Sequence, residues 1–263
     1  MHWERRSLLC YGKMSSQPAR DTHKQGAMTA FEISADEPRI REVASFRELL
    51  TTPFIDGVNA LCWTRKLPGD FGELARLMRS GPGVTTLKED VHSQLPLSAE
   101  GRVALHVMLE DARLLREQGL APELNCVRGY ARDDRFGPIS ADVYSFHVDR
   151  AQVETDTWLC TYFGPASEGL RNDEAQRHVD IPATRAELLQ QYGGADDETF
   201  RDHLEVHSYD LHYAPLANAC PFLFGLGNLW RVAVDWPESR VPPCIHRAPP
   251  AAQDSSARLL LIS

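Results

Sequence analysis

A histidine and an aspartate stand two positions apart in the segment 143–149. The segment alternates and is rich in β-forming residues, which predicts a strand. Side chains on a strand return to the same face at every second residue, so we expect His147 and Asp149 to lie side by side. A neutral imidazole and a carboxylate can each bind a divalent metal ion. This pair is therefore the first candidate for a metal site.

A second histidine and an arginine near the end of the sequence extend the candidate site. His246 would supply a second imidazole, and two histidines with one carboxylate hold iron on one face while leaving other positions open. Arg258 opens the last apolar run, 258–262, and a planar guanidinium binds a carboxylate through two parallel hydrogen bonds. This order of residues resembles the Fe(II)/2-oxoglutarate oxygenases, in which the arginine grips the distal carboxylate of the cosubstrate.

Other interpretations of the same residues stay open. A second His-x-Asp tripeptide at 178–180 shows how easily the motif arises, so His147 and Asp149 could be ordinary surface residues of a strand. Arg258 could in turn pair with Asp254 or with another carboxylate of the chain.

A rival metal site is predicted at His203 and His207, which stand four residues apart. On a helix they would share a face and could bind zinc, with His212 as a third imidazole nearby. Leu204 occupies the position at which the zinc-protease motif has its glutamate. The alternative is that these are polar residues on a solvated insert.

The elements that must position these residues lie mainly in the second half of the chain. Besides the His147 strand, short apolar runs between turn residues predict strands at 124–130, 158–163, 222–226, 230–235, 244–246 and 258–262. This pattern is typical of a jelly roll, in which two antiparallel sheets protect their edges. We therefore predict an α+β fold with a double-stranded β-helix (jelly-roll, cupin-like) core, as a single domain over 31–263. Residues 1–30 are predicted to be a disordered tail, with Met1 or Met28 as the start.

Helices are predicted at 45–50, 68–80, 99–118, 184–192 and 196–204. Ser45 with Glu48 and Thr184 with Glu187 have the spacing of a capping box. We expect the first three helices to buttress the outside of the β core, and the last two to belong to a helical insert at about 166–215.

Trp158, Cys160 and Tyr162 share one face of the predicted strand 158–163. The connection from the His147 strand is short enough for a hairpin, so the two strands are expected to be neighbours. These three residues are therefore weaker candidates for lining a pocket beside the metal. The alternative is that all three belong to the hydrophobic core.

Composition limits the class of protein. The chain has 263 residues, of which 43% are hydrophobic and 25% charged, as in globular proteins. Its net charge of −9 disfavours a nucleic-acid partner. No apolar run reaches membrane-spanning length and no convincing signal peptide is present, so a cytoplasmic protein without a membrane partner is expected. The six scattered cysteines form no C-x-x-C pair and fit buried thiols in a reducing compartment.

Several segments resemble an uncharacterised bacterial family that is known only as a domain of unknown function, with the oxygenase-like motif order. They are residues 58–65, 146–149, 159–162 with 164–165, and 246–250 with 258–260. The resemblance implies that His147, Asp149 and His246 are the metal ligands and that Arg258 is the cosubstrate anchor. The chain departs from the family pattern at Glu168-Gly169 and at Trp158, and both departures bear on the substrate pocket.

Three functions follow from the sequence as hypotheses. The first is an Fe(II)/2-oxoglutarate-dependent oxygenase that acts on a small molecule or a side chain. The second is a non-redox protein that binds zinc or another divalent ion at the same residues. The third is a vestigial oxygenase fold that serves as a protein-interaction module through its acidic surface and its insert. The sequence specifies neither the substrate nor the oligomeric state.

Overall fold

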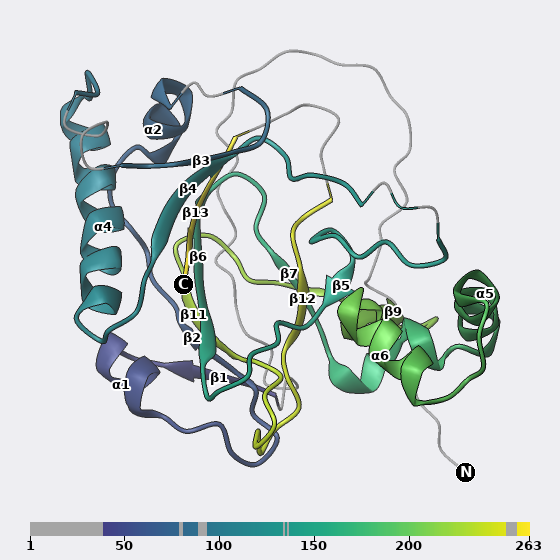
Figure 1. Cartoon of the computed structure of the whole chain (residues 1–263). Helices are drawn as coiled ribbons and strands as arrows, with labels where there is room; N and C mark the ends of the chain where they lie inside the picture. The colour runs from purple at the N-terminus through teal and green to yellow at the C-terminus, as the bar shows by residue number, and fades with distance from the viewer. Residues whose placement is uncertain (1–38, 79–80, 89–93, 134, 136, 251–256) are drawn as a thin grey trace, which may run out of the picture.

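Two β-sheets form the centre of the protein in the computed structural model (Figure 1). The structure describes residues 39–78, 81–88, 94–133, 135, 137–250 and 257–263. The predicted tail over 1–30 and the suggested arginine partner Asp254 lie outside these residues. Helices and sheets are both present, so the α+β class predicted from the sequence is confirmed.

Seven strands form the larger sheet, in the order β1-β2-β11-β6-β13-β4-β3. Their bounds are Ile40–Val43 (β1), Ala60–Trp63 (β2), Val84–Thr86 (β3), Glu123–Val127 (β4), Asp156–Phe163 (β6), Leu229–Ala233 (β11) and Arg258–Ile262 (β13). β1 and β2 run parallel, and the other neighbouring pairs are antiparallel. β13, which begins at Arg258, therefore lies in the interior of the sheet between β6 and β4.

Six short strands form the smaller sheet, in the order β10-β7-β12-β5-β9-β8. Their bounds are Phe146–His147 (β5), Glu168–Leu170 (β7), Ala175–Arg177 (β8), His212–Pro215 (β9), Phe222–Leu223 (β10) and Ile245–Arg247 (β12). All neighbouring pairs are antiparallel. β5 is shorter than the predicted strand 143–149, because the Asp142 carboxylate accepts the Tyr144 N–H at 2.9 Å and holds a turn there.

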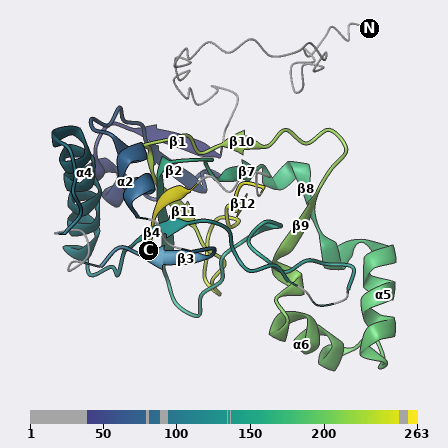
Figure 2. The same ribbon diagram turned by 90° about the horizontal axis from the view of Figure 1, so that it is seen from above.

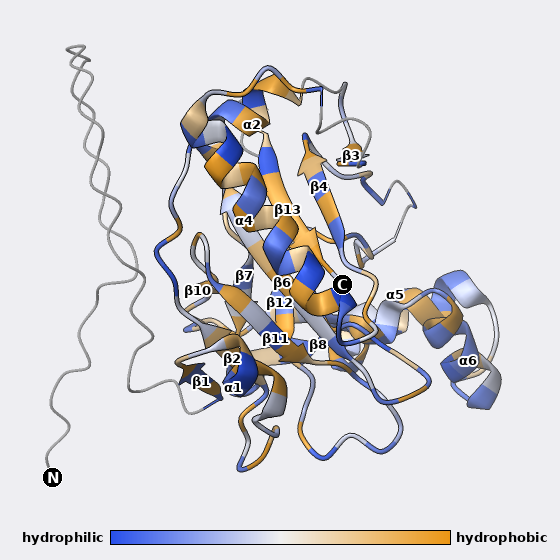
Figure 3. Cartoon of the chain, turned by 90° about the vertical axis from the view of Figure 1, so that its left-hand side faces the viewer, coloured by the Kyte–Doolittle hydropathy of each residue, from blue (hydrophilic) through white to orange (hydrophobic). Residues whose placement is uncertain are grey.

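Three helices lie against one face of the larger sheet (Figures 1 and 3). They are α1 (Phe46–Thr51), α2 (Phe71–Leu77) and α4 (Ala99–Arg116). Ser45 caps α1 as predicted, since its hydroxyl accepts the Glu48 N–H at 3.2 Å and the Glu48 carboxylate accepts the Ala44 N–H at 2.9 Å. α2 begins three residues later than Pro68, because Asp70 provides its N-cap. The prediction that these helices buttress the β core is confirmed.

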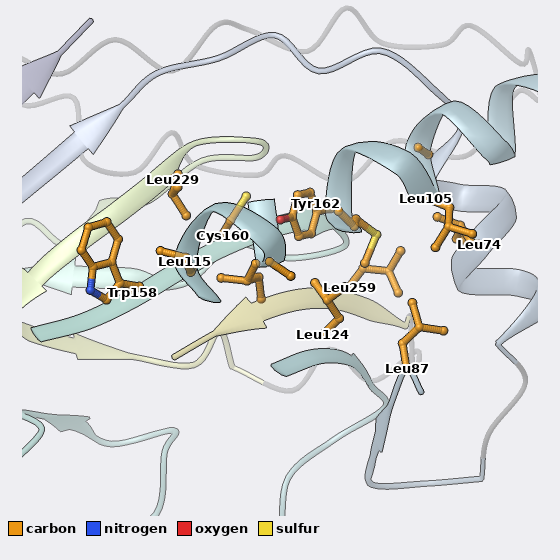
Figure 4. Close-up of a cluster of buried hydrophobic side chains, with 14 of the residues drawn as sticks. Leu74, Leu87, Leu105, Leu115, Leu124, Trp158, Cys160, Tyr162, Leu229 and Leu259 are labelled. Carbon is orange, nitrogen blue, oxygen red and sulfur yellow. The ribbon is translucent and has the colours of Figure 1, made fainter. Parts of the chain in front are cut away.

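The main hydrophobic core fills the space between these helices and the larger sheet (Figure 4). Leu105 and Leu115 of α4 pack there with Trp158, Cys160 and Tyr162 of β6. Because neighbouring residues of a strand face opposite sides, the threonines that alternate with them point toward the smaller sheet. A second buried cluster joins the two sheets, and its members are Ile40, Ala60, Cys62, Leu159, Phe224, Trp230, Val232 and Cys244.

The sequence predicted a helical insert at about 166–215, but this segment also contains strands. Its two ends supply β7, β8 and β9 to the smaller sheet, and helices α5 (Pro182–Tyr192) and α6 (Glu198–Val206) project between them (Figure 2). α5 begins at Pro182, ahead of the predicted cap at Thr184, because proline is favourable in the first helical turn. A separate small core holds the helices in place, and it consists of Ile139, Val179, Leu188, Phe200, Leu204 and Tyr209.

None of the helices in the described residues has the length and apolarity needed to cross a membrane. Four cysteines, Cys62, Cys126, Cys160 and Cys244, are buried as free thiols, as expected. The expectation of a thiol is wrong for Cys220, which is disulfide-bonded.

Gly164→Ala tests how tightly the turn after β6 packs against the start of β13. Gly164 has φ +83°, and an added Cβ would lie 2.6 Å from the Ala257 carbonyl oxygen and 3.0 Å from the Arg258 Cα. Gly119 has φ +79° with nothing within 4 Å of an added Cβ. We expect Gly119→Ala to lower the free energy of unfolding by about 1–2 kcal/mol from backbone strain, and Gly164→Ala to lower it by clearly more. Urea denaturation measures both, and equal losses would contradict the close packing.

Candidate metal centre

The centre of the smaller sheet brings His147 and His246 together. Their Cα atoms are direct partners in the antiparallel pairing of β5 with β12, so both side chains lie on one face. The two ring centroids are 4.8 Å apart. Phe146 and Ile245 point to the opposite face, where they form a separate buried cluster. The sheet register thus joins two imidazoles that lie almost a hundred positions apart in the sequence.

Asp149 completes the group just beyond the end of β5. One potential ligand atom from each of the three residues lies within 4.8 Å of the other two, and His246 Nε2 is 3.7 Å from Asp149 Oδ2. The Asp149 backbone is fixed because its carbonyl accepts the Asp235 N–H at 2.8 Å. The structure therefore places the three predicted ligand residues in one cluster of a size that fits a metal ion.

Both histidines are oriented by their own backbone. His147 Nδ1 lies 2.8 Å from the Ser145 carbonyl oxygen, and His246 Nδ1 lies 3.1 Å from the Cys244 carbonyl oxygen. A carbonyl oxygen can only accept, so Nδ1 carries the hydrogen in each ring and Nε2 keeps its lone pair. Metal-binding histidines are held in this way, with one nitrogen bonded to the protein and the other free for the ion.

Protonation also favours cation binding. Burial, together with the neighbouring His246, lowers the pKa of His147 to about 4. Burial alone would raise the pKa of Asp149, but His246, the Thr157 hydroxyl and His147 together bring it below its ordinary value. At neutral pH the site therefore presents a neutral His147 imidazole and a charged carboxylate, the states that a metal requires.

The larger sheet supports the carboxylate from the opposite side. Thr157 of β6 donates its hydroxyl hydrogen to Asp149 Oδ2 at 2.5 Å. This bond fixes the rotation of the carboxylate and occupies one lone pair of Oδ2. β6 therefore orients a candidate ligand without contributing one.

Arg258 lies buried between the sheets, with only 4% of its surface exposed. Its Nη2 donates to the Thr161 hydroxyl at 2.9 Å and to the Ser167 hydroxyl at 2.6 Å, and its Nη1 donates to the Tyr130 hydroxyl at 3.4 Å. Its Nε has no hydrogen-bond partner among the described residues, and no carboxylate of these residues pairs with the guanidinium. Burial accordingly lowers the pKa of Arg258.

Two strands link Arg258 to the metal-ligand cluster. On β6, Thr161 binds Arg258 and Thr157 binds Asp149 from the same face, about 13 Å apart along the strand. Ser167, which also binds Arg258, comes two residues before Gly169, the Cα partner of His246. The guanidinium and the three candidate ligands thus belong to the same space between the sheets.

The structure places Trp158, Cys160 and Tyr162 on the far face of β6, in the core beneath the helices. There the Tyr162 hydroxyl donates to Asp111 at 2.8 Å, and Asp111 also holds Arg65 in a buried ion pair. These three residues are core residues and do not line the space that contains the candidate ligands. The sequence could not distinguish the two faces, because both faces of β6 are buried.

The rival zinc site does not assemble as predicted. His203 and His207 do share a face of α6, with ring centroids 4.2 Å apart. His212, the expected third imidazole, instead lies on β9 directly opposite His147. The second tripeptide, His178-Val179-Asp180, forms a short 3-10 helix in which Asp180 pairs with Arg177. Within the described residues, His147, Asp149 and His246 form the one group of three potential ligands.

The positions that depart from the family pattern have structural roles. Glu168 pairs with Arg247 on the neighbouring strand β12, and the Arg247 guanidinium lies 4.1 Å from the centroid of the Phe146 ring. Trp158 packs against Phe46, with ring centroids 6.2 Å apart.

Comparison of the chain with protein-family models, with curated proteins and with solved structures gave no match.

Thr157→Val tests whether the bond to Asp149 prepares the site for a metal. Loss of a hydrogen bond to a ligand typically weakens metal binding by roughly 10–100-fold. We expect a loss of this size in the Co²⁺ affinity of the full chain, measured by competition with a chromophoric chelator. Thr157→Ser retains the hydroxyl and is expected to bind Co²⁺ within about threefold of the parent. Similar affinities for parent and valine variant would show that Thr157 does not orient the carboxylate.

Proposed function

We propose that the protein is an Fe(II)/2-oxoglutarate-dependent oxygenase that acts on a small molecule or a side chain. The observation that carries this proposal is the buried Arg258 guanidinium, which has hydroxyl partners but no carboxylate partner among the described residues. It occurs beside a group of two imidazoles and one carboxylate, which is the ligand set of non-haem iron oxygenases.

Burial of an arginine is unfavourable unless an anion or a full set of acceptors compensates it. Three hydroxyl groups partly compensate Arg258, and its Nε remains without an acceptor in the described residues. Both Nη2 hydrogens are already donated to hydroxyl groups, but the Nε hydrogen is not, so a carboxylate placed there would accept a charge-assisted hydrogen bond from the guanidinium and neutralise its charge. A dicarboxylic acid with its other end at the metal cluster fits both requirements.

Each part of the chain then has a definite task. His147, Asp149 and His246 would hold the ion on one side, and Arg258 with the hydroxyls of Thr161 and Ser167 would hold the far carboxylate of the cosubstrate. Bound iron and 2-oxoglutarate supply the oxidation of a substrate C–H bond by O₂, with release of succinate and CO₂. The protein would supply orientation and charge compensation between its two sheets.

The sheet arrangement supports the jelly-roll core that we propose for this domain. Two mainly antiparallel sheets face each other, and a buried cluster with Leu159, Trp230 and Cys244 joins them. The candidate ligands lie on the inner face of the smaller sheet, and Arg258 lies on the inner face of the larger one.

A non-redox zinc site at the same residues is the second candidate, because two imidazoles and a carboxylate accept zinc as readily as iron. The two candidates differ in the role of Arg258, since a zinc site has no need of a carboxylate anchor. Near-stoichiometric zinc in protein purified without added metal, together with no binding of 2-oxoglutarate, would favour the zinc candidate.

The double variant His147→Ala/Asp149→Ala tests the proposed reaction. The assay is uncoupled formation of succinate from 2-oxoglutarate with added Fe(II) in air. We expect a loss of at least about 100-fold, because the removal of two ligands leaves only one protein ligand for the ion. The matched control is His203→Ala/His207→Ala, which removes the rival pair and is expected to keep the parent rate. Parent-level succinate formation by the first variant would refute the assignment.

Arg258→Gln tests the anchor independently of turnover. A charge-assisted hydrogen bond is worth about 1.5–3 kcal/mol, so we expect 2-oxoglutarate to bind the Co²⁺-loaded protein at least about tenfold more weakly. Isothermal titration calorimetry measures this affinity, and the Co²⁺ affinity should not change. Arg247→Gln is the control, since Arg247 lies on the strand of His246 but already pairs with Glu168. Equal 2-oxoglutarate affinities for both variants would show that Arg258 is not the anchor.

A further inference from the structure

A third imidazole lies in register with the two histidines of the candidate metal centre. In the pairing of β9 with β5, His212 is the direct partner of His147, which is in turn the partner of His246. The three strands therefore form a cross-strand row of histidines with their side chains on one face. The ring centroids of His212 and His147 are 5.7 Å apart.

His212 differs from the other two histidines in its hydrogen bonding. His147 and His246 each direct Nδ1 at a backbone carbonyl, but Nδ1 of His212 is buried and has no partner among the described residues. Only 5% of the residue is exposed. Buried polar atoms without a partner are rare, and each one calls for an explanation such as a bound water or ligand.

The imidazole of His212 is not prepared as a protein ligand of the ion. It does not belong to the group of three whose ligand atoms lie within 4.8 Å of one another. No backbone carbonyl of the described residues is bonded to Nδ1, so either nitrogen can carry the hydrogen. An imidazole ring carries at least one N–H, so His212 offers a hydrogen-bond donor whichever nitrogen holds the hydrogen.

We propose that His212 hydrogen-bonds the non-protein ligand of the metal centre, such as water or a small anion bound on the side of His147. This inference rests on the proposed metal centre and gives it a further residue that contacts the bound molecule. His212 would favour a metal-bound ligand that has a free lone pair, because an imidazole N–H needs an acceptor.

Azide is the probe, because it binds metal ions through one nitrogen and accepts hydrogen bonds. The full chain is loaded with Co²⁺, and azide is titrated while the visible absorption of the cobalt is followed. Loss of a hydrogen bond to a charged ligand predicts that His212→Phe weakens azide binding by about tenfold or more. Its Co²⁺ affinity should stay within about twofold of the parent.

Two replacements distinguish a hydrogen bond from a general packing role. His212→Asn carries an amide group near the position of Nδ1, and His212→Gln carries one near Nε2. We expect one of the two to recover most of the azide affinity, which also identifies the nitrogen that donates. His106→Phe, on the exposed face of α4, is the control for histidine replacement and should leave both affinities unchanged.

The outcomes separate this inference from the metal centre itself. Unchanged azide affinity in His212→Phe, or failure of both amide variants to recover it, would overturn the role of His212 and leave the centre intact. A large loss of Co²⁺ affinity in His212→Phe would also overturn it, since His212 would then be a ligand of the ion. A parent protein that binds no Co²⁺ would refute the proposed centre, and the role of His212 would fall with it.

Discussion

The register between β5 and β12 is the constraint on which the site depends. His147 and His246 meet only because their Cα atoms are direct partners, and a slip by one residue would turn one ring to the opposite face. The apolar neighbours on these strands hold the register, since Phe146 and Ile245 are buried together on the other face. Hydrophobic packing on one face thus fixes the pairing of two very short strands, and this pairing sets the positions of the histidines on the other face.

Charge compensation explains the rest of the arrangement between the sheets. The larger sheet gives no ligand to the candidate centre. It does supply the Thr157 hydroxyl, which binds Asp149, and it carries both Arg258 and the Thr161 hydroxyl that accepts a hydrogen bond from it. Hydroxyl groups suit this role because they hydrogen-bond to either charge without adding one. The Arg258 guanidinium and the Asp149 carboxylate therefore each have hydroxyl partners in the interior, and they do not form an ion pair with each other.

The α+β class and the four principal residues of the candidate site could be predicted from the sequence, because side chains that can bind a metal ion and an arginine that opens an apolar run are visible in residue type. The supporting residues could not. Thr157 and Thr161 lie on a strand buried on both faces, so no alternation of polarity shows which side they face. His212 appeared to belong to the helical insert with His203, because nothing local shows that the chain returns to the smaller sheet at β9. Long-range pairing decided these positions, and a single sequence does not display it.

The position of β13 has a consequence for how the protein is made. This strand emerges from the ribosome more than ninety residues after β6 and β4, yet it lies between them and pairs with both. Until it arrives, the nascent chain has an open slot flanked by two unpaired backbone edges, one of them the apolar sequence Trp158-Leu159-Cys160-Thr161-Tyr162. Such edges invite pairing with other chains, so the half-made protein is prone to aggregate until β13 pairs with both strands. The strand that closes the slot is also the one that carries Arg258, so the guanidinium enters the interior in the same step that removes the exposed edges.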